Sequence, residues 1–224
     1  MNTNGNERAL DGRTSMDLEV DAEPFAGMSY LNAVANGRSE STMLGFYRGR
    51  ASWIPEELDG IVVTADLQGI VPHPLTQEPE LMGLAVVDQL VDLYLDGLIP
   101  SPSRLAAVLA GDFFALADIR GGFGCVAEVW QVFATQFAQV IGVAGNHDDV
   151  RQVSRGQGAL LDGDWVTMGP LCVGGIGLMV GHSIKPGRRA DAVPLDRIDA
   201  VVEPFGRIRG RTRGTRSSRD RPHS

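Results

Sequence analysis

Three runs of apolar residues in this chain each end in a side chain that carries oxygen. Asp66 follows IVVTA, Asp112 follows LAAVLAG, and Asn146 follows VIGVAG. His147 and Asp148 come directly after Asn146. Such groups are costly to remove from water unless something pairs with them. The pattern indicates either a charged site built at the ends of strands or a polar loop that happens to follow a strand.

The segments between these residues have the periodicity of helices. Apolar residues recur at helical spacing over 80–98 and again over 122–138. Strand, helix, strand, helix, strand is typical of β-α-β units and a parallel sheet. The carboxyl ends of parallel strands lie along one edge, where α/β proteins bind ligands. The sequence therefore predicts an α/β fold with Asp66, Asp112 and Asn146 at one edge.

Oxygen and imidazole donors gathered at one edge suit a divalent metal ion, such as Mn²⁺, Fe, Zn²⁺ or Mg²⁺. A carboxylate can bridge two such ions. A pair of ions about 3.5–4 Å apart is a known arrangement for the hydrolysis of phosphate esters.

The three motifs resemble those of a known family. TADLQG (64–69), AGDFF (110–114) and AGNHDD (144–149), in this order, look like the first three motifs of the calcineurin-like metallophosphoesterases. The Gly-rich segment 174–189 is similar to one that follows in some bacterial members. The resemblance covers roughly residues 58–200. It implies a four-layer α/β/β/α sandwich, incomplete at the C-terminus, and hydrolysis of phosphoester bonds by a metal-bound hydroxide.

The resemblance also implies a role for each matching residue. Asp66 would bind the first metal ion and Asp112 would bridge both. Asn146 would bind the second ion and contact the substrate phosphate. His147 would be the general acid that protonates the leaving oxygen, and Asp148 would orient the imidazole of His147.

Two features depart from the family's motifs. Gln68 stands where the family usually has His, although its amide oxygen could still ligate a hard cation. The family's downstream Gly-His-x-His motif is not present, and we interpret His182 as a loop histidine rather than a substitute ligand. We therefore expect a weak second metal site and slow or absent turnover. The alternative is a non-catalytic member that acts as a binding or regulatory protein.

Two further residues have a weaker link to the site. Arg188 and Arg189 could contact a substrate phosphate, because guanidinium groups suit phosphate oxygens. A surface pair explains them equally well.

The 224-residue chain is predicted to have three regions. Residues 1–50 are expected to be a flexible acidic arm with a short helix around 28–35, because they are rich in polar and acidic residues. Residues 51–203 would form the metallophosphoesterase-like domain, and 204–224 a disordered Arg-rich tail. The tail could be an out-of-frame terminus of a GC-rich gene or an arm for nucleic acid. Its arginines have no interleaved aromatic residues and the body of the chain is acidic, which favours the first interpretation. Sequencing the gene across the junction distinguishes the two.

The net charge of −8 argues against general binding to nucleic acid or anionic membranes. The sequence shows no secretory signal and no apolar run of about 18–20 residues, so we expect a cytoplasmic protein. Without the family's C-terminal strands a sheet edge would be exposed, which predicts a homo-oligomer or a partner that covers it.

Overall fold

The computed structural model describes residues 17–34, 37–180 and 188–189. The strands and helices are, in chain order, β1 (Leu18–Val20), β2 (Ala26–Val34), β3 (Arg38–Phe46), β4 (Gly49–Ala51), β5 (Gly60–Thr64), β6 (Ile70–Pro72), β7 (Pro79–Leu81), α1 (Met82–Leu95), β8 (Leu105–Leu109), β9 (Gly124–Cys125), α2 (Ala127–Gln136), β10 (Gln139–Val143), β11 (Asp148–Asp149), β12 (Ala159–Leu161), β13 (Asp164–Met168), β14 (Leu171–Gly175), β15 (Met179–Val180) and β16 (Arg188–Arg189). Short 3-10 helices lie at Pro102–Arg104 and Arg155–Gln157.

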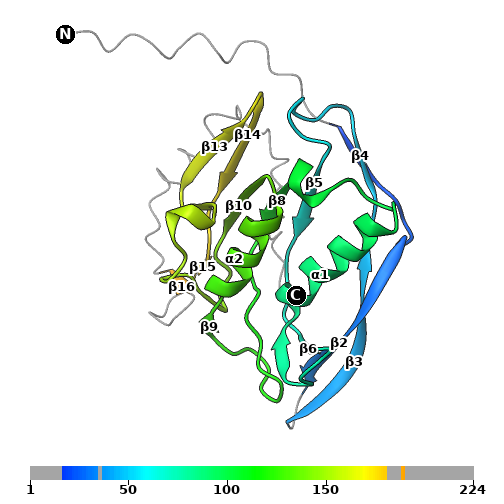
Figure 1. Ribbon diagram of the computed structural model, residues 1–224. Helices are drawn as coiled ribbons and strands as arrows, with labels where there is room; N and C mark the ends of the chain where they lie inside the picture. The colour runs from blue at the N-terminus through cyan, green and yellow to red at the C-terminus, as the bar shows by residue number, and fades with distance from the viewer. Residues whose placement is uncertain (1–16, 35–36, 181–187, 190–224) are drawn as a thin grey trace, which may run out of the picture.

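A parallel sheet with the strand order β12-β10-β8-β5 is the centre of the fold. The three apolar runs form β5, β8 and β10, and the two periodic segments contain α1 and α2, which confirms the predicted α/β class. Successive strands are added in one direction. Right-handed connections, which parallel strands almost always have, therefore place both helices on the same face (Figure 1).

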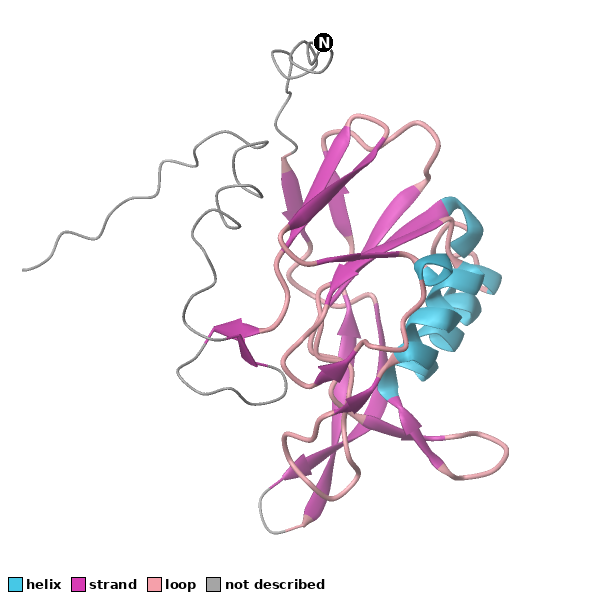
Figure 2. Ribbon diagram, turned by 90° about the vertical axis from the view of Figure 1, so that its left-hand side faces the viewer, coloured by secondary structure: helices cyan, strands magenta, loops and turns pink. Residues whose placement is uncertain are grey.

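The two helices and the sheet enclose the main core. Leu105, Ala107 and Leu109 of β8 are buried in the same cluster as Trp130 and Phe133 of α2. The helices lie against each other on one side of the molecule (Figure 2). They can approach closely because α1 has a glycine at the contact, where a Cβ atom would lie 2.8 Å from a methyl group of α2.

The second face of the parallel sheet packs against a hairpin. Ala106, Ile141 and Leu161 form a smaller core with Met168 and Val173, which belong to β13 and β14. These two strands pair antiparallel along their whole length.

The N-terminal region differs from the prediction. Residues 17–34 and 37–50 are not a flexible arm, because β2 and β3 pair with each other and join β6 and β7 in a second sheet of order β3-β2-β6-β7. The short helix expected around 28–35 is also wrong. Partly buried Met28 and Tyr30 alternate with exposed Ser29, which is the period of a strand. The Asn36-Gly37 dipeptide is a hairpin signal that agrees with this.

The second sheet supports the loop that follows β5. The ring of Tyr30 packs directly on Gly69, where a Cβ atom would lie only 2.3 Å from the ring. Tyr30 also packs against the main core, together with Met28 and Leu44. The N-terminal strands therefore help to place Asp66 and its neighbours.

Some predictions fall outside what the structure describes. The predicted domain end at residue 203 and the tail 204–224 lie outside the described residues. The partner or second copy stays a prediction; β5 and β12 are the outer strands of the parallel sheet. Among the described residues, no helix is long and apolar enough to cross a bilayer.

Replacing Tyr30 with Ala should lower the free energy of unfolding by about 1–3 kcal/mol, because the ring fills the space between the second sheet and the loop at Gly69. Thr42→Ala is the matched control, since Thr42 is the exposed cross-strand partner of Tyr30. It should change stability by no more than about 0.5 kcal/mol. Urea denaturation followed by circular dichroism measures both. Equal effects of the two substitutions would show that the N-terminal strands do not belong to the domain.

Candidate metal centre

The first two strand-end aspartates have a backbone conformation that most residues avoid. Asp66 has φ of 53° and Asp112 has φ of 62°. The left-handed region is uncommon outside glycine, although Asp enters it more readily than most residues. Each of these residues turns the chain sharply where its strand ends, so both strand-end loops stay at the carboxyl edge. In Figure 1 the loops after β5 and β8 lie at the lower end of the sheet, near β6 and β9.

The three strand-end loops contact one another through their backbones. The amide of Asp66 donates a hydrogen bond to the carbonyl oxygen of Gly111, at 3.0 Å. Gly111 and Gly145 lie so close that a Cβ atom on Gly111 would be 2.5 Å from the nitrogen of Gly145. A Cβ atom on Gly145 would be 2.0 Å from the nitrogen of Asp112. The structure therefore brings the first, second and third motifs together, and the glycines permit it.

Asp148 holds the second and third motifs in register. Its side chain is only 2% exposed. One carboxylate oxygen accepts hydrogen bonds from the amides of Phe113 (2.7 Å) and Phe114 (3.1 Å). The other accepts from the amides of Asp112 (2.8 Å) and Gly145 (2.9 Å). Four N–H groups aimed at one anion form a strong charge-assisted network.

His147 lies at the junction of these loops, but Asp148 does not orient it as predicted. Nδ1 of His147 lies 2.5 Å from the carbonyl oxygen of Gly122. A carbonyl oxygen only accepts, so Nδ1 carries the proton and Nε2 is the free ring nitrogen. The backbone amide of His147 donates to Oδ1 of Asp112, at 3.1 Å. The carboxylate of Asp148 binds four backbone amides of the loops and not the ring of His147.

Negative charge concentrates around Asp112. Partial burial is the main cause that raises the pKa of its carboxyl above the ordinary value of 3.8. The hydrogen bond from the amide of His147 lowers this pKa, and the charges of Asp148 and Asp66 raise it. Carboxylates that raise the proton affinity of a neighbour also favour a cation at the same place.

The remaining predicted ligands are less closely tied to the centre. Asn146 is partly buried directly after Gly145, and no described residue hydrogen-bonds to its amide side chain. Gln68 is partly buried, and no described contact joins it to Asp112 or Asn146. Among the described residues, no three His, Cys, Asp or Glu side chains gather as a metal site on their own. Asp66 and Asp112 therefore need the amide oxygen of Asn146 to complete a donor set.

The second acid after His147 has a separate role. Asp149 forms an ion pair with Arg151, at 2.5 Å between Oδ2 and a guanidinium nitrogen. The side-chain hydrogen bond from Arg151 lowers the pKa of Asp149 to about 2. The side chain of Arg151 is 85% exposed and that of Asp149 12%, and the pair uses none of the four amides that bind Asp148.

Other residues singled out in the sequence have different outcomes. The backbone of Arg188 and Arg189 forms β16, which pairs with β15, and their contact with a substrate phosphate stays a prediction. His182 lies outside the described residues.

Sequence reasoning missed the residues that hold His147 in place. Gly122 belongs to the glycine-rich stretch 121–124, which lies between the second and third motifs and leads into β9. β9 pairs with β11, so this stretch runs directly beside His147 and Asp148. Three glycines within four residues are a signal for close backbone approach, and this signal could have pointed to the loop.

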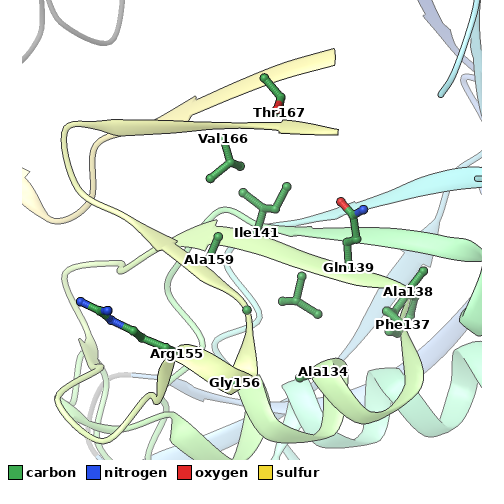
Figure 3. Close-up of a pocket in the computed structure, with 12 residues that line it drawn as sticks. Ala134, Phe137, Ala138, Gln139, Ile141, Arg155, Gly156, Ala159, Val166 and Thr167 are labelled. Atoms are coloured by element: carbon green, nitrogen blue, oxygen red, sulfur yellow. The ribbon is translucent and has the colours of Figure 1, made fainter. Parts of the chain in front are cut away.

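A groove of about 340 Å³ lies away from this centre, at the other end of β10. Its lining includes Ala134, Gln139 and Gly156, with Val166 and Thr167 from β13 (Figure 3). Gln139 is the first residue of β10, whereas Asn146 follows its last, so the groove and the candidate centre lie at opposite ends of the strand. None of the predicted metal ligands lines this groove.

No family model, curated protein or solved structure matches this chain. The family resemblance therefore stays a prediction from the three sequence motifs.

Replacing Asp148 with Asn should lower the free energy of unfolding by about 2–6 kcal/mol. The amide NH₂ would face two of the four N–H donors, and each buried donor left without an acceptor costs about 1–3 kcal/mol. Asp149→Asn is the neighbouring control and should cost clearly less, because it weakens one ion pair with the exposed side chain of Arg151 and leaves the four amide donors of Asp148 satisfied. Thermal and urea unfolding measure both. A loss for Asp148→Asn no larger than the control's would contradict the network.

Proposed function

We propose that this chain is a divalent-metal-dependent hydrolase of phosphoester bonds, similar to the calcineurin-like metallophosphoesterases and with their α/β/β/α sandwich. One observation carries the proposal. Asp66, Asp112 and the Asn146-His147 pair follow three successive strands of the parallel sheet, β5, β8 and β10, and contacts between the loops bring them to one edge. The alternative, a polar loop that happens to follow a strand, does not explain why all three loops contact one another.

The donors fit a hard divalent cation. Two carboxylates and an amide oxygen suit Mg²⁺ or Mn²⁺ better than a soft metal. Partial burial raises the pKa of Asp112, and a bound cation would offset this penalty on the charged carboxylate. Bound divalent ions would supply the charge that polarises the phosphoryl group and activates water.

The chain's own residues would divide the remaining work. Asp66, Asp112 and Asn146 would hold the cation. The carbonyl of Gly122 keeps the proton of His147 on Nδ1, so Nε2 faces away from that contact. A second proton on Nε2 could pass to the leaving oxygen, which is general acid catalysis. Asp148 would act as a positioning residue through the backbone.

A non-catalytic binding or regulatory protein is the second candidate, and the donor set favours it in one respect. His147 is the one histidine that the described residues place at the centre. If His147 acts as the general acid, it is not a metal ligand. A second metal ion would then have only oxygen ligands among the described residues. A chain that binds one cation without turnover fits this arrangement.

Mn²⁺ should stabilise the wild-type chain by about 2.7 kcal/mol at a concentration 100 times its Kd. In Asp112→Asn this stabilisation should be lost, because the bridging carboxylate is gone. Asp92→Asn, an exposed position on α1, should respond to Mn²⁺ like the wild type. Thermal unfolding with and without Mn²⁺ measures the shift, and elemental analysis of the purified protein measures the metal. Equal responses of wild type and Asp112→Asn would refute the metal centre.

Without metal, Asp112→Asn should be at least as stable as the wild type at neutral pH. A raised folded pKa means that the folded state binds a proton more tightly than the unfolded state. The contribution of Asp112 to stability therefore falls as pH rises from the ordinary pKa of 3.8 through the raised value. The difference in unfolding free energy between the two chains, measured from acid to neutral pH, should move in favour of the variant. If the difference in unfolding free energy does not change with pH, the folded state does not raise the pKa of Asp112.

His147→Ala should reduce turnover of an aryl phosphate by about 10²–10⁴-fold in the Mn²⁺-loaded protein, which is the usual share of a general acid. Stabilisation by Mn²⁺ should remain, because His147 is not among the proposed ligands. Wild-type protein that binds Mn²⁺ but does not hydrolyse aryl phosphate at all would favour the second candidate.

A further inference from the structure

The loop between Asp112 and β9 exposes several apolar side chains next to the candidate centre. Leu116, Ile119 and Phe123 are 36%, 55% and 41% exposed and lie within eight residues of one another. The loop's charged side chains, Asp118 and Arg120, are exposed and opposite in sign. Contiguous exposed apolar side chains on a folded protein commonly mark a binding surface.

The loop has a defined shape of its own. A Cβ atom on Gly124 would lie 2.3 Å from the ring of Phe114, and one on Gly122 would lie 2.9 Å from a methyl group of Leu116. Phe114 and Leu116 therefore pack directly on the bare backbone of the returning segment. This packing leaves Ile119 and Phe123 exposed on a supported loop.

The same loop contacts the candidate general acid. Gly122 accepts the hydrogen bond from Nδ1 of His147. A Cβ atom on Gly121 would meet a single described neighbour within 4 Å, which is Cε1 of His147 at 3.5 Å. Cε1 is bonded to both ring nitrogens, so the space over Gly121 borders the edge of the ring between Nδ1 and Nε2.

The steps of phosphoester hydrolysis indicate which part of the substrate would lie in the space beside His147 and Gly121. The reaction breaks the P–O bond to the leaving group, and water supplies the oxygen that replaces it on phosphorus. The departing oxygen takes a proton, which Nε2 of His147 would give. The leaving group must therefore lie on the His147 side of the phosphorus atom, where the loop is.

We propose that Leu116, Ile119 and Phe123 form an apolar platform for the leaving group, and that the preferred substrates are phosphoesters of aromatic or other apolar alcohols. This inference rests on the proposed function, because it assigns a leaving group to that same centre. Apolar contact beside the general acid also removes water from the bond that breaks, which strengthens the electrostatic interactions around it.

Two phosphonates that cannot be hydrolysed test the platform. Benzylphosphonate carries an aromatic ring in the place of an aryl leaving group, and methylphosphonate lacks it. Their Kd values are measured by calorimetry on the full, Mn²⁺-loaded chain. The wild type should bind benzylphosphonate about tenfold more tightly than methylphosphonate, a ratio within the range for apolar contacts in a binding site.

The double variant Ile119→Ser/Phe123→Ser should lose this preference and keep its affinity for methylphosphonate. The matched control is Tyr94→Ser/Leu95→Ser, which removes an exposed aromatic and an exposed aliphatic side chain from the last turn of α1. The control should keep the preference. Phe123→Leu should retain part of it, and far-UV circular dichroism shows that each variant is folded.

Three results would overturn the proposal. The first is a wild type without preference for benzylphosphonate, and the second is a preference that survives in the double variant. The third is a wild-type dimer that the double variant converts to a monomer in sedimentation, which would make the platform a contact between copies. In each case Mn²⁺ binding would leave the proposed function standing, whereas wild-type protein that binds no Mn²⁺ would remove both.

Discussion

The candidate centre depends on one buried anion and the four backbone amides that surround it. Asp148 is contributed by the third strand-end loop, and three of its four donors belong to the second. A carboxylate at 2% exposure is stable only because each oxygen accepts two hydrogen bonds. The interaction fixes the distance between the loops that carry Asp112 and Asn146. It also sets the path of the chain into β9, and so the position of the carbonyl that holds His147.

The two neighbouring carboxylates, Asp148 and Asp112, differ in how many hydrogen bonds they accept. Asp148 has its charge compensated by amides, whereas Asp112 lies beside it with one amide and a raised pKa. The difference assigns the two carboxylates different roles. Under the proposed function, the fully bonded carboxylate would be structural and the incompletely bonded one would bind the cation. Residues held at such a cost cluster at functional sites in proteins.

The sequence predicts those parts of the fold in which burial determines the order of apolar and polar residues. The runs that became β8 and β10 are apolar because both faces of the sheet are covered there, whereas the outer strand β5 is only partly buried and exposes Val63. The ends of the three runs mark the candidate ligands. β2 and β3 escaped prediction because β3 exposes its first six residues, so the segment lacks a clear apolar pattern. The hydrogen-bond partners of Asp148 and His147 could not be predicted from the sequence either. Their partners are backbone groups, whose availability depends on how the loops turn and not on residue type.

The most direct test of the central claim is an anomalous difference map from a crystal of the full chain soaked in Mn²⁺. We expect a peak at the carboxyl edge of the parallel sheet, within about 2.0–2.3 Å of carboxylate oxygens of Asp66 and Asp112 and of the amide oxygen of Asn146. Asp148 should have no Mn²⁺ contact, because its oxygens are occupied by the four amides. A map without a peak at that edge, or with Mn²⁺ on Asp148 and its amides displaced, would contradict the account.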